Sequence, residues 1–281
     1  MEQLTYLRRQ NLRKLTDGAL REPSGLAMDP SGRALWVVGD ASTKAFRLEL
    51  DAHGDTPLRL GERPVVELGR TDLEGVALRD ELTLVAIQEH DPATGASVLV
   101  EHHLATGATR ANPIAEMEGF AEVAGVFGGK RRNWGLEGIT WDGDDQRWLV
   151  MKEGKPGMLL AVSADFGRLS VVCRFDKRAM GFVDAGSVDY SGMDYAGGGR
   201  LWIVSDKARS AFLFELATQQ VVYRSPLTWT KKGKARRIEK AEGVVCDRAR
   251  GRLHVVCDER AEIYTYALPD ALRSGGPPGA G

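Results

Sequence analysis

Short apolar runs separated by turn-forming residues recur along the whole chain, and apolar residues seldom follow helical spacing. Residues 25–38 show the pattern: Gly-Leu-Ala-Met-Asp is followed by Pro-Ser-Gly-Arg and then by Ala-Leu-Trp-Val-Val. Two such runs around a Pro/Ser/Gly turn are typical of a β-hairpin. The same order returns at 192–204 and 243–256, so the pattern predicts an all-β protein built from repeated hairpins.

Each hairpin is followed by a third apolar run, and most repeats add a fourth. The third runs are 45–51, 96–104, 157–163, 211–217 and 262–268, and the fourth runs include 63–68, 169–175 and 220–225. Four antiparallel strands repeated about every 50 residues indicate a β-propeller. We therefore predict a five-bladed propeller of four-stranded antiparallel blades. Six blades are the alternative if the long interval between the second and third repeats hides a degenerate blade.

The two ends of the chain suggest how the ring closes. The fifth repeat runs out after 262–268, whereas residues 5–17 precede the first repeat and contain an additional strand-like run. We predict that this N-terminal strand supplies the outer strand of the last blade, which leaves fewer free sheet edges. Residues 1–274 are expected to form a single domain, and the Gly/Pro-rich residues 275–281 a disordered tail.

Acidic residues recur near the start and at the end of the hairpin in every repeat. A short motif that contains an acidic residue ends in a glycine and an apolar residue, and the second strand of the hairpin then runs into another acid. The motif acids are Glu22, Asp72, Glu74, Glu137, Asp189 and Glu242, and the closing acids are Asp40, Glu89, Glu153, Asp206 and Asp258. Because the hairpin returns to the face that it left, both sets should lie on one face of the ring, with the motif acids nearer the channel.

Carboxylates crowded together raise one another's pKa unless a cation compensates. Ca²⁺ accepts 6–8 oxygen ligands in loose geometry and is the expected ion, with Mg²⁺ or Mn²⁺ as alternatives. Acids at strand ends also cap backbone amides or pair with basic residues, but the repetition of the positions favours a bound cation. We expect Trp36, Trp148 and Trp202 to share one blade position, although this alignment would put Lys152 rather than Glu153 among the closing acids.

The motifs resemble those of the SdiA-regulated family of bacterial β-propeller proteins. The resemblance rests on Glu22-Pro-Ser-Gly-Leu, Asp72-Leu-Glu-Gly-Val, Asp189-Tyr-Ser-Gly-Met, Leu201-Trp-Ile-Val-Ser-Asp and Ala241-Glu-Gly-Val, on Asn-Trp-Gly-Leu-Glu-Gly-Ile at 133–139 and on Lys-Glu-Gly-Lys-Pro at 152–156. It implies a five-bladed propeller, distantly related to NHL-repeat propellers, with a calcium site. The ligand set that it implies is led by Glu74, Glu137 and Glu242, followed by Glu22 and Asp189. The resemblance does not indicate which activity, if any, the protein has.

Two basic stretches lead directly into motif copies, at 130–132 and 231–237. We expect both on the carboxylate face. Their basic residues, Arg236 and Arg237 among them, either balance the acidic rim as solvated loops or bind an anionic ligand that also touches the metal. The closing acids Asp40, Glu89, Glu153, Asp206 and Asp258 would line the same ligand-binding face. Nucleic acid is not an expected partner, because no aromatic residues are interleaved with the basic runs.

Other chemistry is sparse in the sequence. His90 follows Glu89 and is the candidate for a catalytic general base on the carboxylate face. Three cysteines do not form a disulfide framework, and a formal net charge of −1 creates no global field toward nucleic acid or anionic lipid. No apolar run is long enough for a membrane span, and the first residues lack the apolar core of a secretory signal, so we expect a cytoplasmic protein.

Two functions fit these patterns. The first is a calcium-binding propeller whose channel mouth binds a small anionic molecule or a protein partner. The alternative is a metal-dependent hydrolase of the lactonase, esterase or phosphoesterase type, in which the cation polarises the substrate and His90 or a carboxylate activates water. The enzymatic alternative rests on analogy with other propellers.

Overall fold

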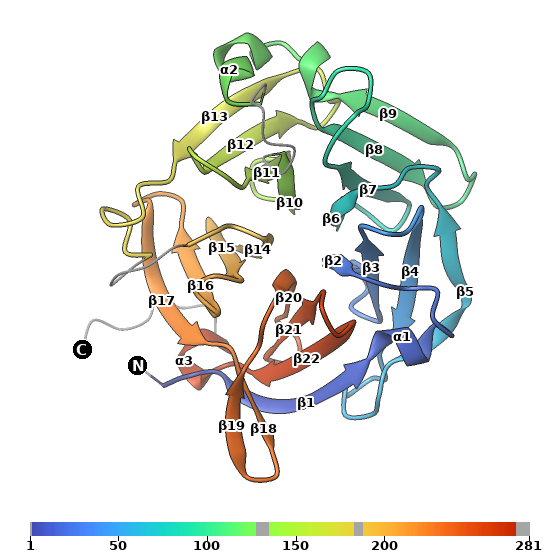
Figure 1. The fold of residues 1–281 in the computed structure, drawn as a ribbon, viewed down its shortest axis with the longest axis vertical. Helices are drawn as coiled ribbons and strands as arrows, with labels where there is room; N and C mark the ends of the chain where they lie inside the picture. Colours follow the sequence, from blue (N-terminus) through green and yellow to red (C-terminus); the bar gives the residue numbers. More distant parts are fainter. Residues whose placement is uncertain (1, 128–134, 183–187, 274–281) are drawn as a thin grey trace.

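The computed structural model describes residues 2–127, 135–182 and 188–273, which include five four-stranded antiparallel sheets arranged as blades around a central axis (Figure 1). This confirms the predicted five-bladed propeller. From the axis outward, the first four blades are β2(Pro23–Met28) to β5(Arg59–Glu67), β6(Leu73–Leu78) to β9(Thr109–Pro113), β10(Leu136–Asp142) to β13(Leu169–Arg174) and β14(Gly192–Gly197) to β17(Gln220–Pro226). Their middle strands are β3(Ala34–Gly39), β4(Lys44–Glu49), β7(Thr83–Gln88), β8(Val98–His103), β11(Arg147–Lys152), β12(Met158–Ser163), β15(Arg200–Ser205) and β16(Ser210–Glu215).

The fifth blade joins the two ends of the chain, as predicted. It consists of β20(Ala241–Asp247), β21(Arg252–Cys257), β22(Glu262–Ala267) and the N-terminal strand β1(Thr5–Asn11), which pairs antiparallel with β22. An ion pair of 2.8 Å between Arg9 Nη1 and Glu262 Oε1 crosses this junction. The N-terminal strand thereby covers the edge that β22 would otherwise expose.

The motif positions require glycine because the inner strands of neighbouring blades approach one another closely. A Cβ atom at Gly25 would lie 2.8 Å from the carbonyl oxygen of Glu74, and one at Gly75 would lie 2.8 Å from the carbonyl oxygen of Glu137. Gly243 closes the circle, since a Cβ there would lie 2.7 Å from the carbonyl oxygen of Ser24. Only glycine permits this backbone contact between neighbouring blades. The same contact brings the acidic motif positions of successive blades together around the axis.

The strand register decides which residue of the third blade belongs with the closing acids. Gly138 pairs with Met151, as Gly25 pairs with Val38, and the residue two places later is Glu153 in one blade and Asp40 in the other. The expectation that Trp148 shares a position with Trp36 and Trp202 is therefore wrong. Trp148 packs against the preceding blade, whereas Trp36 and Trp202 pack against the following one. A shift of one residue moves a side chain to the opposite face of a sheet.

The long interval between the second and third repeats holds short helices rather than a sixth blade. Its described part contains η1(Ile114–Glu116), η2(Phe120–Glu122) and α2(Ala124–Phe127) at the outer edge of the ring (Figure 1). Ile114, Met117 and Val123 are buried in the apolar cluster between the second and third blades. The extra length thus covers a blade interface, and the six-bladed alternative is wrong for this chain.

A separate hairpin, β18(Thr228–Lys231) and β19(Lys234–Arg237), is inserted between the fourth and fifth blades and projects from the ring (Figure 1). Two further short helices, α1(Leu12–Leu15) and α3(Asp270–Arg273), lie near the ring closure. Within the described residues, no helix combines the length and apolar character needed to cross a membrane. The tail expected to be disordered, 275–281, lies outside the described residues.

Candidate functional site

One cavity of about 280 Å³ at the mouth of the central channel gathers the acidic residues of all five blades. Its motif acids are Glu22, Glu74, Glu137, Asp189 and Glu242. Its closing acids are Asp40, Glu89, Glu153, Asp206 and Asp258. Next to it the channel narrows to a space of about 10 Å³ between the motif glycines and the apolar residues that follow them. The carboxylates therefore line a cup rather than an open pore, and we call this space the carboxylate cup.

The backbone at the start of each blade fixes the acids at the rim of the cup. In three blades the residue three places before the motif glycine has left-handed backbone geometry, and its carbonyl accepts a hydrogen bond from the amide of a closing acid. These bonds are Asp40 N to Glu22 O at 3.2 Å, Glu89 N to Asp72 O at 2.9 Å and Asp258 N to Lys240 O at 3.0 Å. The repeated motif thus forms a repeated turn that joins the inner strand to the end of the second strand.

Glu74 and Glu137 are the most electrostatically unfavourable carboxylates of the cup. Burial raises the pKa of the Glu74 carboxyl well above its usual range, and the charges of Glu89, Asp40 and Glu242 raise it further. Burial also raises the pKa of Glu137 strongly, followed by the charges of Glu74 and Glu89. Desolvation and like charges both disfavour the ionised form. The inner ring therefore holds carboxyl groups that ionise only with difficulty in the absence of a cation.

Two neighbours show the same effect at smaller magnitude. Burial raises the pKa of Glu242 to about 8, with a further contribution from Asp206. Burial likewise raises the pKa of Glu89 to about 7, against the opposing effect of a hydrogen bond that Gly135 N donates to Glu89 Oε1 at 2.9 Å. Both pKa values lie near neutral pH, so these two carboxyl groups change their protonation state there.

One side of the cup is partly balanced by a lysine of the protein. Lys207 Nζ lies 3.4 Å from Asp189 Oδ2 and 3.5 Å from Glu153 Oε1. Asp189 also accepts hydrogen bonds from Ser205 Oγ at 2.5 Å and from Lys207 N at 3.1 Å. Asp189 thus caps the end of a strand, and Lys207 of the fourth blade supplies a positive charge beside it. The opposite side, formed by the first and second blades, has no such lysine among the cup residues.

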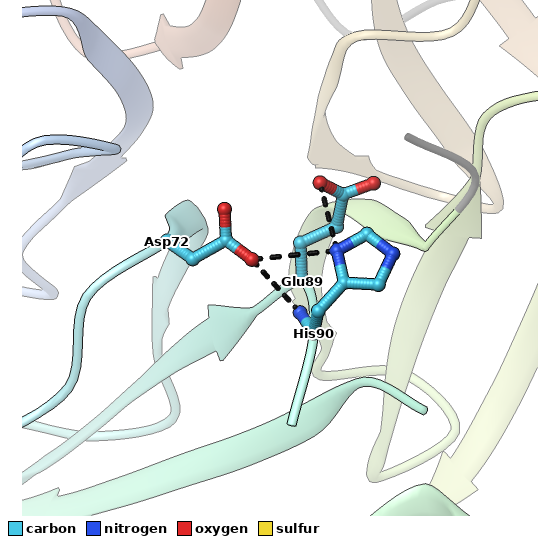
Figure 2. Close-up of side chains that lie close together, drawn as sticks. All are labelled: Asp72, Glu89 and His90. Carbon is cyan, nitrogen blue, oxygen red and sulfur yellow. Dashed lines mark hydrogen bonds and ion pairs between the residues drawn. The ribbon is translucent and has the colours of Figure 1, made fainter. Parts of the chain in front are cut away.

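The uncompensated side contains two compact groups of potential ligands that share Asp72. In one, single oxygens of Asp40, Asp72 and Glu74 lie within 4.8 Å of one another. In the other, atoms of Asp72, Glu89 and His90 meet the same limit, and Figure 2 shows the His90 ring beside the two carboxylates, with Nδ1 facing both. His90 Nδ1 lies 3.3 Å from both Asp72 Oδ2 and Glu89 Oε2. The sequence placed Asp72 among the motif acids but not in the implied ligand set.

Not every sequence-predicted residue reaches the cup. Arg236 and Arg237 line a different cavity beside the β18–β19 hairpin, so the expectation that they contact a ligand at the carboxylates is not met by their position. The other basic stretch, 130–132, lies outside the described residues. Lys207 and Lys240 line the cup and were not singled out from the sequence, although Lys240 precedes the Ala-Glu-Gly-Val motif directly.

A five-bladed ring with carboxylates from every blade at one channel mouth defines a β-propeller with an acidic central cup. The chain belongs to the SdiA-regulated family, whose sequence profile matches residues 5–264. A comparison with curated proteins found no match. The family assignment and the fold agree with each other, and neither by itself specifies a reaction.

Solved structures with a similar chain path are distant from this protein. Virginiamycin B lyase from Staphylococcus aureus is 13% identical with a TM-score of 0.43, over 88% of this chain and 66% of the lyase chain. The gluconolactonase XC5397 from Xanthomonas campestris is 14% identical with a TM-score of 0.48, over 88% and 72%. The Cps50 (Swd1) β-propeller domain from Myceliophteria thermophila is 11% identical with a TM-score of 0.44, over 88% and 84%. Likenesses at this distance carry no argument about function.

Proposed function

We propose that the carboxylate cup binds a divalent cation, with Ca²⁺ as the preferred ion, and that the occupied cup binds a small anionic ligand or a protein partner. The observation that carries this proposal is the burial of Glu74 and Glu137 among other carboxylates, which raises the pKa of both groups. Folding assembles these groups despite their repulsion. A cation turns that repulsion into attraction, because every nearby carboxylate then becomes a ligand or a favourable charge.

The chemistry and spacing of the donors favour a hard cation. The group of Asp40, Asp72 and Glu74 offers only carboxylate oxygens, which suit Ca²⁺, Mg²⁺ and Mn²⁺. Ca²⁺ binds oxygens at roughly 2.3–2.6 Å, so two ligands on opposite sides of the ion are about 5 Å apart. The 4.8 Å limit within this group is compatible with that span. Ca²⁺ also tolerates irregular geometry better than Mg²⁺, and the ligands here come from two blades.

The first test is metal removal. The purified protein is expected to contain Ca²⁺ by elemental analysis and to melt on the order of 10 °C lower after chelation, because an ion that binds only the folded state stabilises it by about 4 kcal/mol at a thousandfold excess over its dissociation constant. Ca²⁺ should restore the melting temperature better than Mg²⁺ or Mn²⁺. A protein without bound metal, whose melting temperature is the same with chelator and with Ca²⁺, would contradict the proposal.

A metal-dependent hydrolase is the second candidate, and the arrangement of His90 favours it. If Nδ1 donates to Asp72 or Glu89, both of which lie 3.3 Å away, then Nε2 is left as the proton acceptor. His90 is also partly exposed beside the cup. The cation would supply polarisation of the substrate carbonyl or phosphoryl group, while Nε2 of His90 accepts the proton of the attacking water.

The hydrolase reading predicts Ca²⁺-dependent turnover of a lactone, carboxylic ester or phosphate ester. Changing His90 to glutamine should then lower kcat by about a hundredfold, since general-base catalysis contributes at least that much. The matched control is His53→Gln, which alters an exposed histidine on a surface turn. Rates would be measured with a panel of the three ester classes in Ca²⁺ and in chelator. Turnover that is equal in H90Q would exclude His90 as the general base, and an absence of turnover with every substrate would leave the binding function as the sole proposal.

A further inference from the structure

A second cavity, also of about 280 Å³, lies between the fourth and fifth blades beside the β18–β19 hairpin. Four arginines line it, Arg209, Arg236, Arg237 and Arg260, together with one acidic residue, Glu239, and the aromatic residues Trp229 and Tyr264. We call it the arginine cavity. Its charge is opposite to that of the carboxylate cup, and the two cavities share no lining residue.

The hairpin is anchored so that Arg236 lies on the face that it turns toward the ring. Trp229 and Arg236 are directly opposite each other in the β18–β19 register, so their side chains lie on the same face of the hairpin. Trp229 is only 4% exposed, and the Arg9 guanidinium lies 4.1 Å from the centroid of its ring. Burial of the tryptophan therefore fixes the hairpin against the ring closure, and Arg236 is directed toward the body of the protein with it.

The charges of the arginine cavity are poorly balanced by the protein. Arg209 Nη2 lies 3.7 Å from Glu239 Oε1, and both side chains are about half exposed. Within the described part of the chain, Arg236, Arg237 and Arg260 form no ion pair with a carboxylate. Guanidinium groups that share a cavity repel one another unless an anion lies between them. An arginine fork matches the two oxygens of a carboxylate or phosphate group in a bidentate arrangement.

We propose that the arginine cavity binds a small molecule that carries a phosphate or carboxylate group. The arginines at its wall would hold the anionic group, and Trp229 and Tyr264 would contact an apolar or planar part of the same molecule. This site is separate from the proposed cation site, because the two cavities share no lining residue. It needs neither Ca²⁺ nor His90. The inserted hairpin thus gives this propeller a ligand site at a blade seam, outside the central channel.

The test is direct binding of two probes, inorganic phosphate and succinate, to the full chain by isothermal titration calorimetry. All titrations contain chelator, so that no bound cation can recruit the anion. We expect at least one probe to bind, and we expect R236A/R237A to weaken that binding by about tenfold or more, since a hydrogen bond to a charged group is worth roughly 1.5–3 kcal/mol. Which probe binds distinguishes a phosphate ligand from a carboxylate ligand.

The matched control is K231A/K232A, which removes the same charge from the same hairpin at exposed residues that do not line the cavity. This variant should bind the probe nearly as well as the unmodified chain. A second variant, R236K/R237K, keeps the charge and loses the planar fork, and it should bind more weakly than the unmodified chain. Equal losses of binding in R236A/R237A and K231A/K232A would indicate general electrostatics and overturn the proposal. Binding to phosphatidylglycerol vesicles without binding of either free probe would overturn it as well.

Discussion

Changing both Glu74 and Glu137 to glutamine is expected to weaken Ca²⁺ binding by about two orders of magnitude, because Ca²⁺ affinity depends on the number of charged ligands. The same double variant should stabilise the metal-free protein. Both carboxyl groups have a strongly raised pKa because they are buried beside other carboxylates. Glutamine has nearly the same shape as a protonated glutamic acid. Because it carries no charge, its burial does not require an ionised group to be desolvated or protonated. One variant therefore has opposite effects with and without the ion.

The measurements are Ca²⁺ titration by calorimetry and thermal melts at neutral pH in chelator. Each pKa unit corresponds to about 1.4 kcal/mol, so the metal-free variant should melt at least a few degrees above the unmodified protein. The control is E81Q/E116Q, which neutralises two exposed glutamates outside the cup. Its Ca²⁺ affinity and melting temperature should stay close to those of the unmodified chain. Undiminished Ca²⁺ binding by E74Q/E137Q would show that the ion binds outside the carboxylate cup.

The metal-free protein is expected to lose stability as the pH rises from about 5 to about 8. Burial raises the pKa of Glu89 from 4.5 to about 7 and that of Glu242 from 4.5 to about 8. Between the unfolded and the folded pKa, the folded state binds more protons than the unfolded state. The stability is therefore complete below the unfolded pKa and decreases as the pH passes through the folded pKa.

Saturating Ca²⁺ should reverse this trend, because the ion binds the ionised carboxylates and competes with protons. Melting temperatures would be recorded at half-unit steps from pH 5 to pH 8, once in chelator and once in excess Ca²⁺. The two curves should converge at pH 5 and separate progressively toward pH 8. Parallel curves across this range would mean that the cup carboxylates neither hold protons in the folded protein nor bind the ion.

The repeat pattern made the fold predictable. Each blade repeats the same run of strands, the same motif glycine and acids near both ends of the hairpin. The sequence therefore contains five copies of one local structure. The role of the motif glycine follows from the close approach of the inner strands, in which a Cβ atom at Gly75 would lie 2.8 Å from the Glu137 carbonyl oxygen. Because an acid lies one or three places before the motif glycine in every blade, the ring that aligns the glycines also brings the acids together.

The expectation for Trp148 was wrong for a reason that sequence alone does not reveal. Trp148 pairs with Trp141, whereas Trp36 pairs with Ala27, which lies one place nearer its motif glycine. The blades share the register of the motif glycine, and the tryptophans do not occupy one position relative to it. The side-chain period of a strand is two, so that single place reverses the blade that the residue contacts.

The sequence by itself determined the five blades, the closure by the N-terminal strand and the presence of eleven recurring acids, because these follow from local periodicity and from spacing. The tertiary structure decided which acids remain uncompensated. Lys207 forms ion pairs with both Glu153 and Asp189. Asp40, Asp72 and Glu74 lie close together, and among the described residues no lysine pairs with them in this way. It also separated Arg236 and Arg237 from the cup. The physical reason is that charge balance depends on which side chains of different blades meet in space, and a repeat along the chain does not encode those distances.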